Sequence, residues 1–253
     1  MRHIFATRPI AEYENYTALH LGAGEKYHKR FVANPGRALM WDLEQAALRD
    51  LIGGLEPRRA LDFACGTGRI SSFVEKAFPE LAIDGIDISE SMLELARKQG
   101  ARTEYRLMDT QQAISFYGER HFDLVMAFRF FPNAEVPLRQ RIAADLARLV
   151  SDDGALVINN HRNFWSTSYF ARRLKGERPM GALNSDIEGL FTDQGFRVVR
   201  RLSLGVWPQG DRHALLLPWK AVRALEEKNL ASMAAHHTLG YNTIWVLSRK
   251  TPG

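Results

Sequence analysis

The feature that most constrains the fold is a regular alternation of apolar strand patterns and amphipathic helix patterns, which starts at residue 59. Such alternation predicts a parallel sheet that is covered by helices on both faces. The predicted strands cover residues 59–64, 82–88, 103–108, 122–128, 154–160, 196–204 and 242–250. Helix patterns lie between them at 68–78, 89–100, 137–150 and 184–196.

Three segments do not fit this alternation. Residues 1–58 combine an irregular aromatic stretch with one helix pattern, and residues 161–183 and 206–238 each follow a predicted strand. In a parallel α/β sheet the ligand crevice lies beyond the carboxyl ends of the strands. We therefore expect one domain over residues 1–253, in which these segments form a lid. Its core would be 59–160, completed by 184–205 and 239–253.

Composition fits a globular domain, with 45% hydrophobic and 25% charged residues. The single cysteine, Cys65, excludes an intramolecular disulfide, and no window of about 18 apolar residues predicts a transmembrane helix. Pro9 and Glu12 interrupt the N-terminus too early for a signal peptide, so we expect a cytoplasmic protein. The net charge of +5 is compatible with acidic partners, including nucleic acid, although the charges form no single run.

The most informative motif in the sequence is LDFACGTGRI at residues 61–70. It combines an apolar strand that contains an acid, two glycines separated by one residue, and the start of a helix. Gly66 and Gly68 allow a tight turn and a close approach of a ligand to the backbone. The next strand ends at Asp87, whose carboxylate could accept hydrogen bonds from both ribose hydroxyls. The dinucleotide fingerprint requires a third glycine where Ser71 stands, which disfavours an NAD-dependent oxidoreductase.

Together with GIDISESMLELAR at residues 85–97, this word resembles motifs I and II of the class I S-adenosylmethionine-dependent methyltransferases. The resemblance covers about residues 55–160. It implies a Rossmann-like fold, in which a seven-stranded, mostly parallel sheet ends in an antiparallel strand. It also implies S-adenosyl-L-methionine as the cofactor and methyl transfer as the activity.

The same resemblance implies roles for individual residues. Asp62 would order the glycine turn near the methionyl ammonium, Asp87 would bind the ribose, and Asp109 would accept from the adenine amino group. A turn or helix-capping role is the alternative for Asp109. The other residues that it places near the cofactor are Ala64, Gly66, Gly68, Ile88, Met92, Thr110, Ala127 and Phe128, with Cys65 packing the turn.

The chemistry of the acceptor is less constrained than the cofactor. The fourth predicted strand ends in the sequence AFRFFPN. This sequence lacks the Pro-Pro motif of enzymes that methylate planar nitrogens. His161, at the end of the fifth predicted strand, is the best candidate for a general base, and a structural histidine is the alternative. Arg129 could hold an anionic group, or could instead pair with Glu135 or Asp123.

Further acceptor-binding candidates are basic, polar or aromatic residues of the presumed lid: Arg162, Asn163, Arg172, Arg173, Tyr16 and Arg37. Aromatic residues interleaved with arginines can bind stacked rings, but a helix with an aromatic core face produces the same pattern. We expect no metal, because His236 and His237 have no partner at metal-ligand spacing.

Three functions follow as hypotheses. The first is a methyltransferase that modifies a hydroxyl, or less readily an amine, of a small-molecule or glycan acceptor. One form of this hypothesis is that the acceptor is negatively charged. The second is an RNA methyltransferase, which the basic composition favours. The third is a non-catalytic subunit that binds the cofactor and a partner protein. The sequence does not indicate the oligomeric state.

Overall fold

A computed structural model of the chain describes residues 35–99, 102–177, 179, 181–208, 217–231 and 239–250. Its centre is a seven-stranded sheet in the order β3-β2-β1-β4-β5-β7-β6. The strands are β1 (Arg59–Phe63), β2 (Ala82–Asp87), β3 (Glu104–Leu107), β4 (Phe122–Ala127), β5 (Val150–Asn160), β6 (Phe196–Leu204) and β7 (Asn242–Arg249). All seven predicted strands are present, with boundaries shifted by a few residues.

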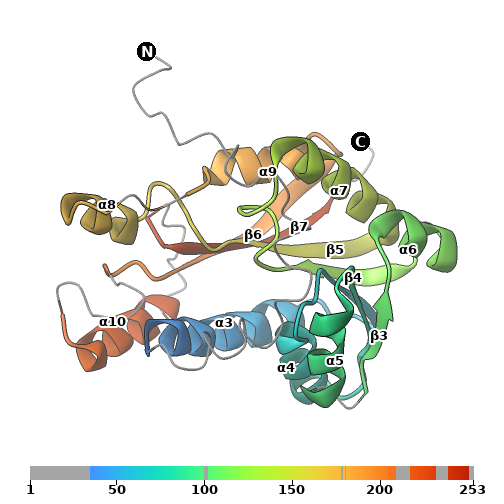
Figure 1. Ribbon diagram of the computed structural model, residues 1–253, viewed down its shortest axis with the longest axis horizontal. Helices are drawn as coiled ribbons and strands as arrows, with labels where there is room; N and C mark the ends of the chain where they lie inside the picture. The colour runs from blue at the N-terminus through green and yellow to red at the C-terminus, as the bar shows by residue number, and fades with distance from the viewer. Residues whose placement is uncertain are drawn as a thin grey trace.

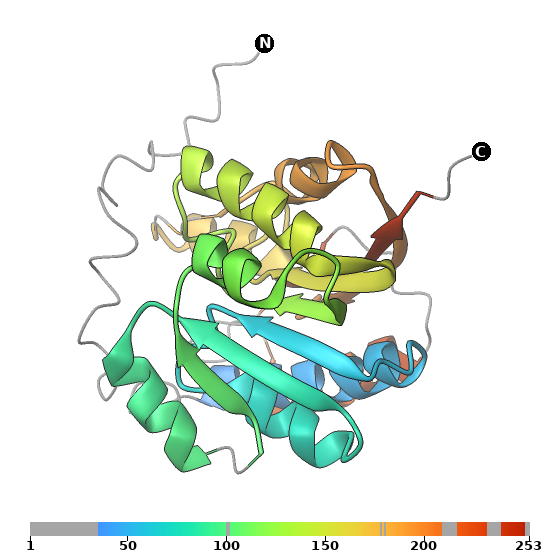
Figure 2. The same cartoon turned by 90° about the vertical axis from the view of Figure 1, so that its right-hand side faces the viewer.

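Strand directions agree with the expected fold class. β1 pairs in parallel with β2 and β4, and the parallel pairing continues to β3 on one side and to β5 on the other. β7 is antiparallel to both of its neighbours, β5 and β6. The predicted Rossmann-like sheet with an antiparallel last strand is therefore confirmed, and Figure 2 shows the twist of its strands.

Helices cover both faces of the sheet (Figure 1). On one face lie α3 (Pro35–Gly53), α4 (Arg69–Ala77), α5 (Glu90–Gln99) and α10 (Trp219–Ala231). On the other face lie α6 (Thr110–Tyr117), α7 (Val136–Leu149) and α9 (Asn184–Thr192). The short helix α8 (Thr167–Leu174) lies beyond the end of the sheet, at the left of Figure 1. No helix in these described ranges is long and apolar enough to cross a membrane.

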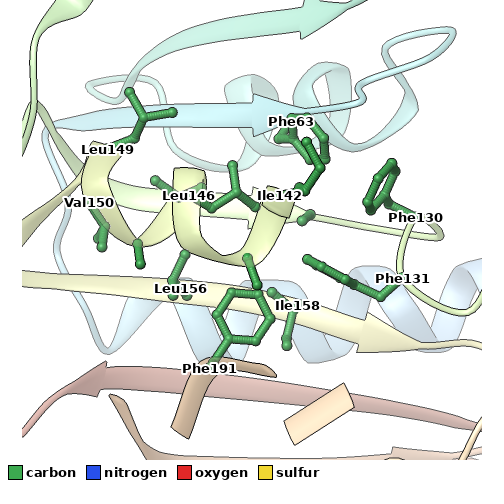
Figure 3. Packing of buried hydrophobic residues seen from close by; sticks show 14 of the residues in the cluster. Phe63, Phe130, Phe131, Ile142, Leu146, Leu149, Val150, Leu156, Ile158 and Phe191 are labelled. Atoms are coloured by element: carbon green, nitrogen blue, oxygen red, sulfur yellow. The ribbon is translucent and has the colours of Figure 1, made fainter. Parts of the chain in front are cut away.

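The two layers of helices bury two apolar clusters against the sheet. Figure 3 shows the first cluster, in which Ile142 and Leu146 of α7 pack on Leu156 and Ile158 of β5, beside Phe191 of α9. The second cluster joins α3, α4 and α10 to the opposite face of the same strands. Because both faces of the central strands are covered, these strands consist mostly of apolar residues, as the sequence pattern indicates.

One helix, α6, was not predicted from the sequence, and a helix at the position of α8 was only one of two interpretations of its arginines and aromatic residues. α6 has only eight residues, too few for a clear amphipathic repeat, and its signal is a capping box at its start. α8 falls within residues 161–183, which were expected to form part of a lid. β5 begins at Val150 instead of residue 154, because Val150 already pairs with Phe122 before an irregularity in the register.

The lid itself is only partly described. The segment after β5 is hydrogen-bonded to the segment before β7, since Asn163 N donates to Tyr241 O at 3.0 Å and Thr167 N to Leu239 O at 3.2 Å. Residues 1–34, 209–216 and 232–238 lie outside the described residues. The closure of a lid over the crevice stays a prediction.

Candidate cofactor and acceptor site

The turn that follows β1 is built from residues with left-handed backbone conformations. Ala64, Gly66 and Gly68 have φ values of 51°, 55° and 73°. A Cβ on Gly68 would lie 2.5 Å from Tyr105 Oη and 2.9 Å from Ala96 Cβ, so this glycine is needed for packing. A Cβ on Gly66 would meet no atom of the described residues within 4 Å. Gly66 therefore faces open space, where a ligand can approach the backbone closely.

Asp62 lies beneath this turn, near the end of β1, and is buried. Its Oδ2 accepts a hydrogen bond from the backbone N–H of Ser71, at 3.1 Å, in the first turn of α4. Burial raises the pKa of Asp62 from its ordinary value of 3.8 to about 7, and the neighbouring charge of Asp87 adds to the increase. The carboxyl group thus connects the strand to the helix that follows the glycine turn. Its role near a methionyl ammonium stays a prediction.

Asp87 ends β2 on the opposite side of the turn. Its Oδ2 accepts from Gly66 N at 2.8 Å, and its Oδ1 accepts from Ser89 N at 2.9 Å. These two backbone donors fix the carboxylate beside the open space at Gly66. Each carboxylate oxygen has a further lone pair, so the group can still accept hydrogen bonds from a ligand. The next residue, Ile88, is 39% exposed, which suits an apolar surface for a planar ring.

Asp109, predicted to contact adenine, caps helix α6. Its Oδ1 accepts from Gln112 N at 2.8 Å, and Gln112 Oε1 accepts from Asp109 N at 2.9 Å. The carboxylate is exposed, so a capping role and a ligand contact are compatible. Thr110 differs, because its hydroxyl is buried and donates to Asp145 Oδ2 at 2.6 Å. The hydroxyl of Thr110 therefore fastens α6 to α7.

The remaining predicted cofactor residues lie at the same edge of the sheet. Met92 is buried on α5, and Cys65 is buried in a small cluster with Leu93, Ala96 and Tyr105, as expected for a residue that packs the turn. Ala127 and Phe128 are also buried, so at the end of β4 they offer a ligand their backbone atoms and not their side chains.

A buried polar network crosses from helix α3 to the carboxyl ends of the central strands. Its centre is Glu44 of α3, which is fully buried. Glu44 Oε1 accepts from Arg129 Nη2 and from Asn242 Nδ2, both at 2.8 Å. Glu44 Oε2 accepts from Arg69 Nη1 at 3.2 Å. One carboxylate thus holds a guanidinium from the start of α4 and another from the end of β4.

The network closes on itself through two asparagines. Asn159 Nδ2 donates to Asn242 Oδ1 at 2.9 Å, and Asn159 Oδ1 accepts from the backbone N–H of Arg129 at 2.7 Å. Arg129 has a positive φ of 61°, which is uncommon for a non-glycine residue and is often found at functional sites. The structure therefore fixes both the backbone and the guanidinium of Arg129. The acid that pairs with it, Glu44, was not among the partners that the sequence suggested.

His161 follows β5 at this same edge and is buried, with 8% of its surface exposed. Its Nδ1 has no hydrogen-bond partner among the described residues. Burial, together with the charges of Arg162, Arg129, Arg69 and Arg37, holds the pKa of His161 well below its ordinary value. The imidazole is therefore neutral at physiological pH, in surroundings that are rich in positive charge.

The other predicted acceptor residues fall into three groups. Arg37 and Arg162 are half-buried and act electrostatically on His161. Arg172 and Arg173 lie on α8, where Arg172 Nε donates to Glu177 Oε2 at 2.7 Å and Arg173 is exposed. Tyr16 lies outside the described residues.

Asn163 is 1% exposed, and its amide is used within the protein. Its Nδ2 donates to Gly240 O at 3.0 Å, and its Oδ1 accepts from Trp165 N at 3.1 Å. Asn160 is similarly engaged, with Ala182 O and Asn184 Oδ1 each 2.9 Å from its Nδ2. These asparagines hold the loop after β5 in place.

Four residues of the network were missed by the sequence analysis: Glu44, Arg69, Asn159 and Asn242. Glu44 had a usable signal, since it occupies a position on the buried stripe of α3 with Leu43, Ala47 and Leu48. An acid on such a stripe must have a buried partner. Its partners come from distant parts of the chain, and no local pattern identifies them.

Comparisons with known proteins identify the domain family and several relatives of this chain. Residues 60–154 match a family described as a methyltransferase domain. The demethylmenaquinone methyltransferase of Thermotoga maritima is 34% identical over 110 residues, which are 43% of this chain and 46% of that protein. The trans-aconitate 2-methyltransferase of Methylobacterium nodulans is 30% identical over 130 residues, 50% of this chain and 47% of that protein. In these matches the chain spans about half the length of each relative.

Solved structures extend the similarity beyond the matched region. The magnesium protoporphyrin IX methyltransferase of Synechocystis PCC 6803, solved with S-adenosylmethionine bound, superposes with a TM-score of 0.57 at 17% identity. The superposition covers 94% of each chain, so the shared fold includes almost the whole protein. The glycine turn, the fixed Asp87, the strand order and these matches agree on one assignment. Residues 60–154 match a methyltransferase domain, and the chain has the fold of the class I S-adenosylmethionine-dependent methyltransferases.

Proposed function

We propose that the protein transfers the methyl group of S-adenosylmethionine to a hydroxyl oxygen, or less readily an amine, of a small-molecule acceptor. The observation that carries this proposal is the geometry of Asp87 and Gly66. Two backbone N–H groups orient the carboxylate of Asp87, and the missing Cβ of Gly66 leaves room directly beside it. These are the features that a ribose-bearing ligand requires at the end of β2.

The other residues at this edge fit the same cofactor. Ile88 offers an exposed apolar surface for the adenine ring, and the exposed carboxylate of Asp109 can accept from an adenine amino group. Asp62 offers a negative charge near the glycine turn for the methionyl ammonium. When bound, the cofactor supplies a methyl group that is activated by a positive sulfur atom. The protein then has to hold the acceptor in line with that group.

His161 is our candidate for the base that takes the acceptor proton. It follows β5, next to β4 in the sheet, so it lies at the edge where Ala127 and Phe128 end β4. A neutral imidazole with an unpartnered Nδ1 can accept a proton. Arg129 is our candidate for a positioning residue at the acceptor, because its guanidinium is held by Glu44 and its backbone by Asn159.

A small-molecule acceptor is consistent with the named activities of the relatives, demethylmenaquinone methyltransferase and trans-aconitate 2-methyltransferase. The RNA methyltransferase and the non-catalytic subunit are the competing hypotheses. A catalytically silent subunit would bind the cofactor and release no S-adenosylhomocysteine with any acceptor.

The test begins with calorimetric titration of S-adenosylhomocysteine into the wild-type protein and into Asp87→Ala and Asp109→Asn. Asp87→Ala should abolish measurable binding. Asp109→Asn should keep the helix cap, since Asn caps helices as well as Asp. It should nevertheless weaken the affinity, because an amide is a poorer acceptor than a carboxylate. Absence of binding to the wild-type protein would refute the proposed function.

The second stage measures release of S-adenosylhomocysteine across a library of hydroxyl and amine acceptors, with His161→Ala in parallel. Turnover that His161→Ala lowers by about 100-fold or more would support a general base. Turnover that His161→Ala leaves unchanged would exclude this role for His161 and leave the methyl transfer itself intact.

A further inference from the structure

The surroundings of His161 are rich in positive charge. Four guanidinium groups act on the imidazole: Arg162 beside it in sequence, Arg129 at the end of β4, Arg69 at the start of α4, and Arg37 on α3. The buried acid that bonds directly to members of this group is Glu44, which is shared between Arg69 and Arg129.

Arg162 differs from the two arginines that Glu44 holds. It is half-buried, and its guanidinium forms no hydrogen bond or ion pair with any residue that the structure describes. Its backbone is nevertheless fixed, because Arg162 N donates to Asn160 Oδ1 at 3.1 Å and Arg162 O accepts from Ala182 N at 2.9 Å. A half-buried guanidinium on a fixed backbone can bind an anionic carboxylate or phosphate group of a ligand.

The second, independent sign of a ligand is His161 itself. Its buried Nδ1 lacks a partner in the described part of the chain, and buried polar atoms without partners are rare in folded proteins. An oxygen atom of a bound molecule would provide that partner. Arg129 follows β4, the strand next to β5, and its backbone has a left-handed conformation. Its backbone N–H bonds to Asn159 and its guanidinium to Glu44.

We propose that the acceptor carries a carboxylate or phosphate group, which binds between Arg162 and Arg129 beside the imidazole of His161. This inference rests on the proposed methyl transfer and names the substrate class of the same site. Carboxylate and phosphate groups both bind guanidinium groups through anionic oxygen atoms. Separate titrations with citrate and with inorganic phosphate distinguish the two.

The proposal also explains how His161 can act despite its surroundings. As the acceptor oxygen bonds to the methyl carbon, the carbon–sulfur bond breaks, its electron pair stays on sulfur, and the hydroxyl proton passes to the imidazole. The imidazolium that forms would be repelled by Arg162, Arg129, Arg69 and Arg37. An anionic group on the acceptor offsets this repulsion, so the acceptor itself makes His161 a stronger base.

The experiment titrates citrate and inorganic phosphate separately into the free protein and into its complex with S-adenosylhomocysteine, at pH 7, with glycerol as the uncharged control. We expect at least one anion to bind and glycerol not to bind. Arg162→Gln and Arg129→Gln should each lower the affinity for the anion at least about tenfold, because each variant loses a charge-assisted hydrogen bond. Arg148→Gln is the matched control, because Arg148 pairs with exposed Glu119 at the opposite end of α7, and it should have no effect.

A second readout follows the pKa of His161 by NMR of its imidazole Cε1–H signal. The pKa should rise when the anion binds, and it should rise in free Arg162→Gln because one repelling charge has gone. Binding of citrate alone assigns a carboxylate acceptor, and binding of phosphate alone assigns a phosphorylated one.

Two results would overturn the proposal: no anion bound in either state, or anion affinity unchanged in both arginine variants. If S-adenosylhomocysteine binds while the anions do not, only this inference fails. If S-adenosylhomocysteine fails to bind, the proposed function fails, and titration of the free protein still decides whether the anion site exists.

Discussion

Single residues of this protein carry charge in places where helix and strand patterns call for apolar groups. Glu44 is the clearest case, because it is fully buried on the core face of α3 and binds both Arg69 and Arg129. The two arginine side chains are 17% and 19% exposed, so the ion pairs are largely shielded from water. Buried pairs of this kind add little when intact but are costly to break, since a charge is then left without compensation.

We therefore expect Glu44→Gln to lower the free energy of unfolding by about 2–4 kcal/mol, measured by urea denaturation. The amide keeps the shape of the carboxylate but removes the negative charge from between the guanidinium groups. Glu90→Gln is the matched control, because Glu90 pairs with Arg97 on the surface, where the change should stay below about 0.5 kcal/mol. Equal free energies of unfolding for the two variants would show that the network around Glu44 does not stabilise the folded protein.

Asp62 makes a pH-dependent contribution whose sign follows from its burial. Its pKa in the folded protein is about 7, against an ordinary value of 3.8, so between these values the folded state binds more protons than the unfolded state. The contribution of Asp62 to stability is therefore complete below pH 3.8 and is lost as the pH rises to about 7. Above that pH the protein contains a buried carboxylate, which the hydrogen bonds from Ser71 and the charge of Arg69 stabilise only in part.

Asp62→Asn should remove this dependence, because the amide has no proton to lose and can still accept from Ser71 N. We expect the free energy of unfolding of Asp62→Asn, relative to the wild-type protein, to increase from pH 5 to pH 8 in urea denaturation without cofactor. The same variant should bind S-adenosylhomocysteine more weakly at pH 8. A difference in stability that stays constant over this pH range would contradict the assigned shift.

At the scale of elements, the turn between β1 and α4 separates two uses of glycine. Gly68 has no room for a Cβ, because Tyr105 and Ala96 pack against it, whereas Gly66 has room that nothing in the described protein fills. Both have positive φ, so alanine at either position adds a backbone cost of about 1–2 kcal/mol. Only at Gly68 does a steric clash add to that cost.

We expect Gly68→Ala to lose at least about 1 kcal/mol more of unfolding free energy than Gly66→Ala, because of its added clash. Gly66→Ala should instead lower the affinity for S-adenosylhomocysteine at least tenfold, about 1.4 kcal/mol, because its methyl group enters the space left for the ligand. Urea denaturation and calorimetric titration of the two variants measure the two effects. If Gly66→Ala binds the ligand normally, the cofactor does not pass this residue.

The sequence predicted the elements well where a local pattern determines them. The seven strands are short apolar runs, and the words around Asp62, Gly66, Gly68 and Asp87 each lie within one strand and its following turn. Helix α6 was missed although its capping box, Asp109 with Gln112, was visible, because eight residues give too weak an apolar repeat. The acceptor side of the site was less predictable. Glu44 and Asn242 are 198 positions apart, and only the assembled sheet brings them together.

At the scale of the whole molecule, several of the arginines that make the composition basic are paired with acids on the surface. Arginines on many elements pair with nearby acids: Arg97 with Glu90, Arg148 with Glu119, Arg200 with Asp50, Arg201 with Glu188 and Arg223 with Asp42. These pairs neutralise much of the positive surface in the described ranges. Recognition of RNA draws most of its affinity from basic groups that contact consecutive phosphates, and such groups would have to be free of these partners.

We expect single-stranded RNA of about 20 nucleotides to bind with a Kd weaker than about 10 µM at near-physiological salt. The measurement is fluorescence anisotropy of a labelled RNA between about 50 and 200 mM salt, with S-adenosylhomocysteine titrated into the same samples. The nucleoside should keep its affinity over this range, because its main contacts are hydrogen bonds to partly buried groups such as Asp87. A sub-micromolar Kd for RNA that increases steeply with salt concentration would contradict this expectation. It would make the RNA methyltransferase the better hypothesis, with the arginines around His161 as phosphate ligands.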